Sequence, residues 1–297
     1  MMNHSAPSTP PASAPPEPIT TSCPRPVARP VMLQEWHDLA SLHWPYEPAV
    51  VEAQLPRGLR VDTYGGVAWV GLIPFHMQRI RLPRGPALRG WSTFPETNVR
   101  TYVVAPDGRR AVWFFSLDVT SLVPAVVART AYGLPYCWSA MSINRPTPDT
   151  VEYATTRRWP HGGATSRVRI GIGEPVERPD GLEQFVTARW ALASDLLGSG
   201  MWADVDHAPW PLHRAELLHC DDWLMAAAGL PEPVGDPLVL WSPGVEVRVG
   251  RPRRRPQQSA AAMSAAPVER APSRAARMRA SLPSPAAHEE QGTDDAA

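Results

Sequence analysis

The chain has 297 residues, and its 29 basic and 29 acidic side chains give a formal net charge of zero. Balanced charge steers the protein toward neither nucleic acid nor an acidic membrane surface. The sequence contains no lysine, so every basic residue is an arginine. A lysine Schiff base, a lysine general base and a phosphate-loop lysine are therefore excluded.

The aromatic side chains confine the hydrophobic core to the middle of the chain. All 12 Trp, 6 Tyr and 5 Phe fall between Trp36 and Trp241. Residues 1–30 are rich in proline, residues 251–297 are rich in Ala, Arg and Pro, and neither segment buries enough apolar surface to offset its ordering entropy. We predict one domain over residues 31–250, between a disordered Pro-rich tail at 1–30 and a disordered Arg/Ala/Pro-rich tail at 251–297.

Extended segments joined by hairpin turns dominate the predicted domain. Gly65 and Gly66 can adopt the positive φ values of a tight turn between strands at 59–64 and 67–75. A Pro-Asp-Gly turn follows between strands at 98–104 and 110–117. Further strands are predicted at residues 139–144, 151–157 and 166–170, and a last hairpin is predicted to turn at 242–244 between 238–241 and 245–249.

A few short helices interrupt these strands. The third is the clearest, because Asp180 can cap it and apolar residues recur behind it at helical spacing. The four predicted helices cover residues 48–55, 121–133, 180–198 and 222–228. Strands joined mostly by hairpins, with helices inserted, indicate a mainly β fold, a β-rich α+β protein whose antiparallel sheet curls into a barrel-like structure.

The segment at residues 94–103 carries the most informative pattern. Alternate side chains of a strand share a face, so Glu96, Asn98, Arg100 and Tyr102 form one polar row. The row either faces solvent on an exposed strand, or it faces the inside of a barrel and converges on a ligand. In the second interpretation Arg100 clamps a carboxylate, Glu96 transfers protons as the second catalytic residue, and the other two contact the ligand.

Two aromatic residues beside prolines are expected at the mouth of such a cavity. They are Trp44 and Tyr136, which we predict to contact the ligand; most other tryptophans are expected to pack in the core.

Seven segments, in order along the predicted domain, carry a recognisable pattern. They are WHDLASLHWPY at 36–46, LPRGLRVDT at 55–63, FPETNVRTYV at 94–103, WFFSLD at 113–118, LPY at 134–136, HAPWPL at 207–212 and WSPGVEV at 241–247. Together they resemble the uncharacterised YqjF-like family of bacterial proteins over about residues 31–250. The resemblance implies the acetoacetate-decarboxylase-like fold, a curled antiparallel β architecture with an internal cavity. The decarboxylases of that fold form a Schiff base through a lysine, so their mechanism does not carry over to this chain.

Motifs for metals and nucleotides are not found. His37 and His43 are six residues apart, and no cysteine or carboxylate completes a ligand set, so no metal site is predicted. Gly171 and Gly173 lack the third glycine and the following helix of a dinucleotide fingerprint. We therefore expect no cofactor.

The cysteines and the hydropathy pattern give expectations about location. Cys23, Cys137 and Cys220 are odd in number and far apart, and the Pro-broken N-terminal region does not resemble a signal peptide. No run reaches the roughly 18 apolar residues of a membrane span. We expect a cytoplasmic protein with no membrane partner.

Three functions remain open from the sequence. The domain is either an enzyme that binds a small organic acid or carbonyl compound and uses general acid–base chemistry, or a non-catalytic small-molecule-binding or regulatory protein. In the third alternative the polar row is structural and the arginine-rich tail binds nucleic acid, the one route by which we expect such binding. The sequence specifies neither the ligand nor the oligomeric state.

Overall fold

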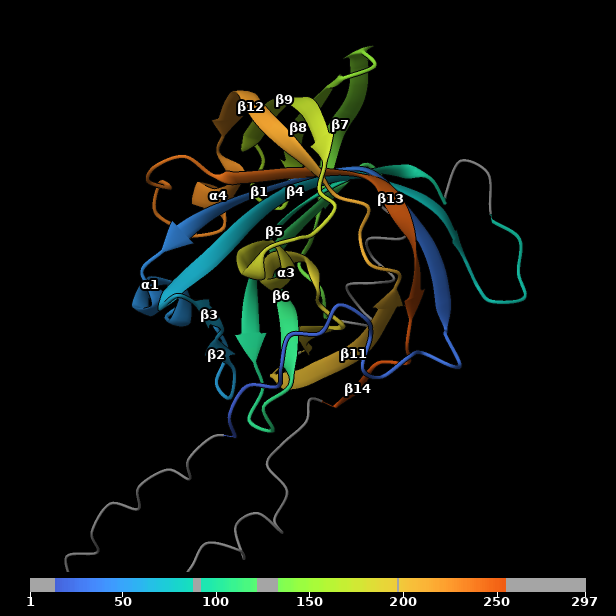
Figure 1. Ribbon diagram of the computed structural model, residues 1–297, viewed down its shortest axis with the longest axis vertical. Helices are drawn as coiled ribbons and strands as arrows, with labels where there is room; N and C mark the ends of the chain where they lie inside the picture. Colours follow the sequence, from blue (N-terminus) through green and yellow to red (C-terminus); the bar gives the residue numbers. More distant parts are fainter. Residues whose placement is uncertain (1–13, 88–91, 122–132, 197, 255–297) are drawn as a thin grey trace, which may run out of the picture. The chain divides into compact units, whose positions relative to one another are not determined.

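Strands follow one another along nearly the whole described chain (Figure 1). The computed structural model describes residues 14–87, 92–121, 133–196 and 198–254. These residues belong to one unit, Met1–Gln258, whereas a second unit, Ser259–Ala297, lies wholly outside them. Nearly all of the helix predicted at 121–133 also lies outside the described residues.

The elements have the following bounds. The strands are β1 (Met32–Tyr46), β2 (Arg60–Val61), β3 (Thr63–Tyr64), β4 (Val67–Arg81), β5 (Phe94–Val104), β6 (Arg110–Val119), β7 (Tyr136–Thr147), β8 (Thr150–Trp159), β9 (Thr165–Pro175), β10 (Ala191–Leu196), β11 (Ser199–His207), β12 (His213–Asp222), β13 (Leu238–Val249) and β14 (Arg253–Arg254). The helices are α1 (Pro48–Glu52), α3 (Gly181–Thr187) and α4 (Leu224–Ala227).

The described strands form one mixed sheet that closes on itself. Its order is β14-β11-β10-β6-β7-β8-β9-β12-β13-β1-β4-β5-β2, and additional pairings join β5 to β6 and β11 to β13. Two closed circuits therefore share strands β13, β1, β4, β5 and β6. Adding β10 and β11 completes a seven-strand circuit, and adding β7, β8, β9 and β12 completes a nine-strand circuit, which is a closed mixed barrel.

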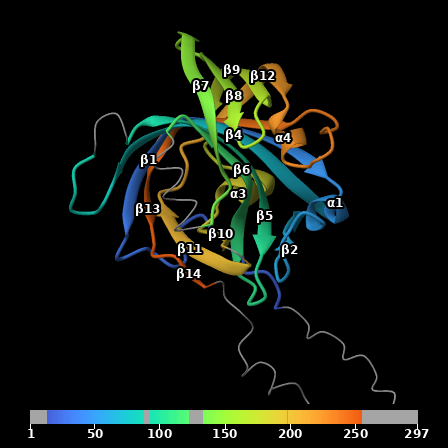
Figure 2. The same cartoon turned by 180° about the vertical axis from the view of Figure 1, so that it is seen from behind.

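The shared strands form a band with one group of strands on each side. Figures 1 and 2 show β7, β8, β9 and β12 on one side of this band, and β10, β11 and α3 on the other. Most pairings are antiparallel, but β6 runs parallel to both β7 and β10. The predicted mainly β, barrel-like fold is confirmed.

Strand alternation sends neighbouring residues of β5 into different circuits. Val99 packs in the apolar core of the nine-strand circuit. The hydroxyl of Thr97 lies 3.1 Å from that of Thr155 in β8. Glu96 and Asn98 face the other way, into the seven-strand circuit.

A buried ion pair joins β6 and β8 in the nine-strand circuit. Arg157 donates from Nε to Oδ1 of Asp118 over 2.8 Å and from Nη2 to Oδ2 over 2.6 Å. Ser139 donates a further hydrogen bond of 2.6 Å to the same carboxylate. Bidentate pairing of this kind makes a buried guanidinium tolerable, because each charge satisfies the other.

The hairpin at Gly65 and Gly66 is confirmed, with φ values of 62° and 79° between β3 and β4. The hairpin predicted at residues 242–244 is wrong, because β13 runs straight through it and stays paired with β1. Gly244 has φ of 135°, and a Cβ atom there would lie 2.1 Å from the carbonyl oxygen of Trp36. Glycine thus lets β13 pass close to β1 with a local bend instead of a turn.

The helix predicted over residues 180–198 is too long. Asp180 and Glu183 form a reciprocal capping box that starts α3, with two hydrogen bonds of 2.8 Å. The helix nevertheless ends at Thr187, and after a short loop the chain forms β10, which pairs with β11 and β6. Pairing between distant strands overrides the local helical spacing here. The predicted helices at 48–55 and 222–228 correspond to α1 and α4.

Segments outside the predicted domain boundaries also bond to the barrel. The amide of Glu17 donates to the carbonyl of Gly108 over 2.8 Å, and that of Val27 donates to Asp206 over 3.1 Å. At the other end β14 pairs with β11. The rest of both predicted tails lies outside the described residues. Among the helices of the described chain, none has the length and apolar character needed to cross a membrane.

Candidate functional site

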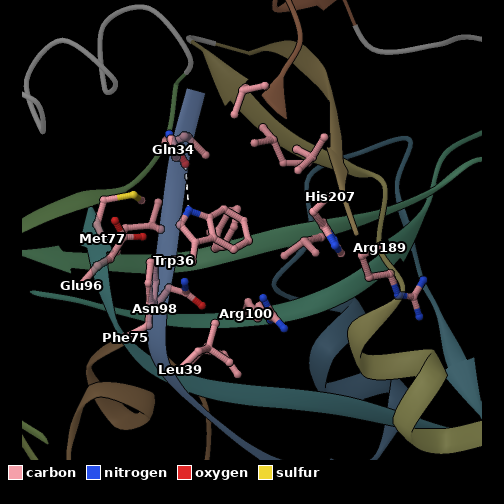
Figure 3. A pocket seen from close by; sticks show the side chains of 18 of the residues that line it. Gln34, Trp36, Leu39, Phe75, Met77, Glu96, Asn98, Arg100, Arg189 and His207 are labelled. Carbon is pink, nitrogen blue, oxygen red and sulfur yellow. Dashed lines mark hydrogen bonds between the residues drawn. The ribbon is translucent and has the colours of Figure 1, made fainter. Parts of the chain in front are cut away.

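The seven-strand circuit surrounds a cavity of about 100 Å³ (Figure 3). Pockets for drug-sized ligands measure roughly 300–1,000 Å³, so this cavity suits a small organic molecule. Much of its wall is apolar and comes from the band of shared strands. This apolar wall includes Trp36, Leu39, Ile73, Phe75, Met77, Phe114 and Leu117.

Three members of the polar row line the cavity. Glu96, Asn98 and Arg100 project into it from alternate positions of β5 (Figure 3). Glu96 is 3% exposed and Asn98 is 4% exposed, so the row does not face solvent. The structure thus places these three side chains in the barrel interior.

Glu96 is a buried carboxyl group that holds its proton at neutral pH. Burial raises its pKa to about 8, the charge of Asp118 acts in the same direction, and the Asn98 side chain acts in the opposite one. Oε2 of Glu96 has no hydrogen-bond partner among the described residues. A carboxyl group with a pKa near neutrality can serve as a general acid or base.

Arg100 differs from Arg157 in having no carboxylate partner in the described part of the chain. Its Nη2 donates to the carbonyl oxygen of Val186 over 3.3 Å. Its Nε is buried and has no hydrogen-bond partner there. Since arginine stays protonated in proteins, this end of the cavity holds a positive charge available to an anion.

A second guanidinium stands beside the first. Arg189 lies in the loop after α3 and lines the cavity, with 5% of its surface exposed. Its Nη1 donates to Asp62 over 2.6 Å and its Nε donates to the carbonyl of Phe185 over 2.7 Å, whereas Nη2 has no partner among the described residues. Asp62 also binds Arg110. Two arginines thus share the carboxylate of Asp62, and Arg100 has no carboxylate partner among the described residues, which leaves an excess of positive charge in this region.

His207 completes this basic end as a neutral side chain. Burial lowers its pKa, and the nearby charge of Arg100 acts in the same direction. Nδ1 lies 2.7 Å from the carbonyl oxygen of Ala208, to which it donates. Figure 3 shows Arg100, His207 and Arg189 toward one end, Glu96 and Met77 toward the other, and Asn98 between them.

Tyr102 follows the same row but lies behind the cavity wall, so its predicted contact with a ligand is corrected. Its hydroxyl donates to the carbonyl of Val186 over 2.7 Å and lies 2.6 Å from Nε2 of His43. Since that hydroxyl proton is used, Nε2 of His43 must donate, and Nδ1 accepts from Ser41 over 3.2 Å. Burial holds the pKa of His43 well below its usual value, and Arg100 and Arg189 add to this effect.

The two predicted mouth aromatics have different places. Tyr136, at the start of β7, lines the cavity. Trp44 does not: it is buried in the core of the nine-strand circuit. A bulge in β1, where Asp38 has φ of 46°, puts Leu39 on the cavity side and Leu42 and Trp44 on the core side.

Sequence reasoning did not select Arg189 as a site residue. Its one local signal is a single charge flanked by Ala188 and Trp190, which is typical of a buried, partnered charge. For metals, no three His, Cys, Asp or Glu side chains of the described residues come together in a way that would hold an ion.

The mixed sheet that closes on itself, with an internal cavity in its seven-strand circuit, has an acetoacetate-decarboxylase-like fold. The enduracididine biosynthesis enzyme MppR, in complex with the condensation product of pyruvate and imidazole 4-carboxaldehyde, matches with a TM-score of 0.57 and 15% identity, over 76% of this chain and 89% of that one. An acetoacetate decarboxylase-like enzyme from Sphingomonas wittichii RW1 matches with a TM-score of 0.54 and 16% identity, over 77% and 94% of the two chains. These likenesses show the fold.

The family follows from sequence. The profile of DUF2071, "Uncharacterized conserved protein (COG2071)", matches residues 33–246. Protein YqjF of Bacillus subtilis (strain 168) is 31% identical over 213 residues, which are 71% of this chain and 87% of YqjF. The chain belongs to this family, and the resemblance to the YqjF-like proteins is confirmed.

Proposed function

We propose that the domain is an enzyme that binds a small organic acid or carbonyl compound in the seven-strand cavity and acts on it by general acid–base chemistry. The observation that carries this proposal is that one cavity contains both Glu96, a carboxyl group with a pKa of about 8, and a cationic end formed by arginines. The molecule bound to MppR, a condensation product of pyruvate, supports a small organic acid as the class of ligand.

The basic end binds the carboxylate of the ligand. Arg100 and Arg189 each keep a buried N–H group without a partner among the described residues. Guanidinium groups form strong, charge-assisted hydrogen bonds with carboxylates, and both are held in place by hydrogen bonds to the backbone around α3. The apolar wall of this small cavity lowers the local dielectric constant, which strengthens this attraction.

Glu96 acts on the part of the ligand that lies away from the carboxylate. Below pH 8 it is protonated and donates a proton to a ligand oxygen; above pH 8 it accepts one. Because the sequence has no lysine, the reaction does not pass through a lysine Schiff base.

A second candidate function is a non-catalytic binding or regulatory protein. The protonated state of Glu96 at neutral pH favours it, because a neutral carboxyl is also a plain hydrogen-bonding group for a ligand. Exchange of solvent deuterium into a carbon–hydrogen bond of a bound acid distinguishes the enzyme from the binding protein. An enzyme of this kind promotes this exchange, and Glu96→Gln stops it without preventing binding. No exchange into any acid that binds would favour the binding protein.

Thermal-shift screening with small aliphatic and aromatic carboxylic acids tests the binding step. An acid present at 100 times its Kd should stabilise the folded protein by about 2.7 kcal/mol. Arg100→Leu should abolish the shift and keep the fold, whereas Arg248→Leu, on the exposed face of β13, should leave it unchanged. An equal shift in wild type and Arg100→Leu would contradict the proposal.

A further inference from the structure

Buried polar atoms without partners gather on the wall of the cavity. They are Oε2 of Glu96, Oδ1 of Asn98, Nε of Arg100 and Nη2 of Arg189, none of which has a hydrogen-bond partner among the described residues. Each such atom costs about 1–3 kcal/mol when it is left unsatisfied. Most buried polar atoms of folded proteins are satisfied by protein, water or ligand, and these four belong to residues that line one cavity, where a bound molecule can satisfy them.

These atoms differ in what they require. The two guanidinium groups can only donate, so they require an acceptor, which the proposed carboxylate supplies. Oδ1 of Asn98 can only accept, so it requires a donor. A ketone or aldehyde oxygen is an acceptor and cannot satisfy it, whereas a hydroxyl group can.

The order of the side chains along β5 sets the distance between the two ligand groups. Asn98 lies between Glu96 and Arg100 in the cavity (Figure 3). Residues two apart on a strand are roughly 6–7 Å apart, so about two or three carbon atoms separate a carboxylate at Arg100 from a hydroxyl at Asn98. A ligand of this length is compatible with a cavity of about 100 Å³.

We infer that the ligand of this cavity is a short hydroxy acid, whose carboxylate binds Arg100 and Arg189 and whose hydroxyl donates to Oδ1 of Asn98. This inference rests on the proposed function and narrows its ligand class. Glu96, next along the row, faces the same hydroxyl and is the group that exchanges a proton with it. Ile73, Phe75 and Met77 pack against the carbon chain.

The competing explanation is a hydrogen bond within the protein. The side chains of Glu96 and Asn98 lie within hydrogen-bond reach of each other, and a protonated Glu96 that donates to Oδ1 of Asn98 satisfies that acceptor without a ligand. The cavity would then have no preference for a ligand hydroxyl, and hydroxy, oxo and unsubstituted acids would bind alike.

Calorimetric titration of the full chain with matched acids distinguishes these explanations. The probes are 3-hydroxybutyrate against butyrate, and 4-hydroxypentanoate against 4-oxopentanoate and pentanoate. At least one hydroxy acid should bind about tenfold more tightly than its partners, as expected for one buried hydrogen bond. Asn98→Leu should remove this preference and keep carboxylate binding, whereas Asn98→Asp, which keeps the acceptor, should retain the preference.

The outcomes separate the inference from the proposed function. Equal binding of hydroxy, oxo and unsubstituted acids by the wild type, lost in Arg100→Leu, overturns the hydroxy-acid inference and supports the carboxylate site. A hydroxyl preference that persists in Asn98→Leu overturns the role of Asn98. Binding of none of the acids overturns the proposed function, and the inference with it.

Discussion

Arg189 lies over the ring of Tyr102, with Cζ 4.5 Å from the ring centroid. This contact joins the cavity to the buried hydrogen-bond network behind it. The hydroxyl of Tyr102 bonds to Val186 of α3 and to His43 of β1, and Arg100 bonds to the same Val186 carbonyl. The two guanidinium groups are thus held in place by residues that do not themselves line the cavity.

Removing the Tyr102 hydroxyl tests this network. Tyr102→Phe leaves the Nε2–H group of buried His43 without its acceptor, so the free energy of unfolding should fall by about 1–3 kcal/mol. Urea unfolding at neutral pH measures the change, with an unchanged m-value expected. Tyr64→Phe, at a residue that is 39% exposed, should change stability by less than about 0.5 kcal/mol. Equal effects of the two variants would show that the network contributes nothing.

The buried Glu96 should make stability depend on pH. Its pKa rises from an ordinary value of 4.5 to about 8 in the folded protein, so the folded state binds the proton more tightly. The stabilisation from the proton is complete below pH 4.5 and is lost as the pH rises to about 8. Glutamine at position 96 does not titrate. The free energy of unfolding of Glu96→Gln should therefore rise by about 3–5 kcal/mol relative to that of the wild type between pH 4.5 and about pH 9.

Urea unfolding of both proteins across this pH range provides the measurement. Glu246→Gln, at an exposed position of β13, is the matched control and should follow the wild type at every pH. A constant stability difference between wild type and Glu96→Gln across the range would mean that Glu96 titrates as an ordinary exposed carboxylate.

Replacing one partner of the buried ion pair in the nine-strand circuit should lower the free energy of unfolding more than replacing one partner of an exposed ion pair. Asp118→Asn leaves the guanidinium of Arg157 buried without its carboxylate, which typically costs about 3–5 kcal/mol. Glu152→Gln removes the partner of Arg169, a largely exposed pair, and should cost less than about 1 kcal/mol. The comparison uses chemical denaturation, and similar losses in the two variants would rule out a special contribution from the buried pair.

The sequence predicts the site residues whose positions follow from neighbouring residues in the chain. It does not predict those whose positions depend on contacts with distant segments. Strand alternation places Glu96, Asn98 and Arg100 together, because the period of two is a property of the strand itself. Tyr102 obeys the same alternation, but its surroundings depend on α3, which packs across it from a distant part of the sequence.

Positions that depend on long-range packing were not predictable from local pattern. Trp44 faces the core because a bulge at Asp38 shifts the alternation of β1, and nothing in the local pattern marks that bulge. Arg189 lies in the cavity because the chain leaves α3 at Thr187 and enters β10, where helical spacing predicts a continuous helix. The Ser-Pro-Gly segment resembles a turn, and only its pairing with β1 shows it to be a bend in one strand.

The most direct test of the proposed acid–base site is a titration of the Glu96 carboxyl by ¹³C NMR, with Glu96→Gln used to assign its resonance. A midpoint near pH 8 is expected, because the side chain is buried on the cavity wall. A midpoint near the ordinary value of 4.5 would place a solvated carboxylate there and would contradict the proposed acid–base role.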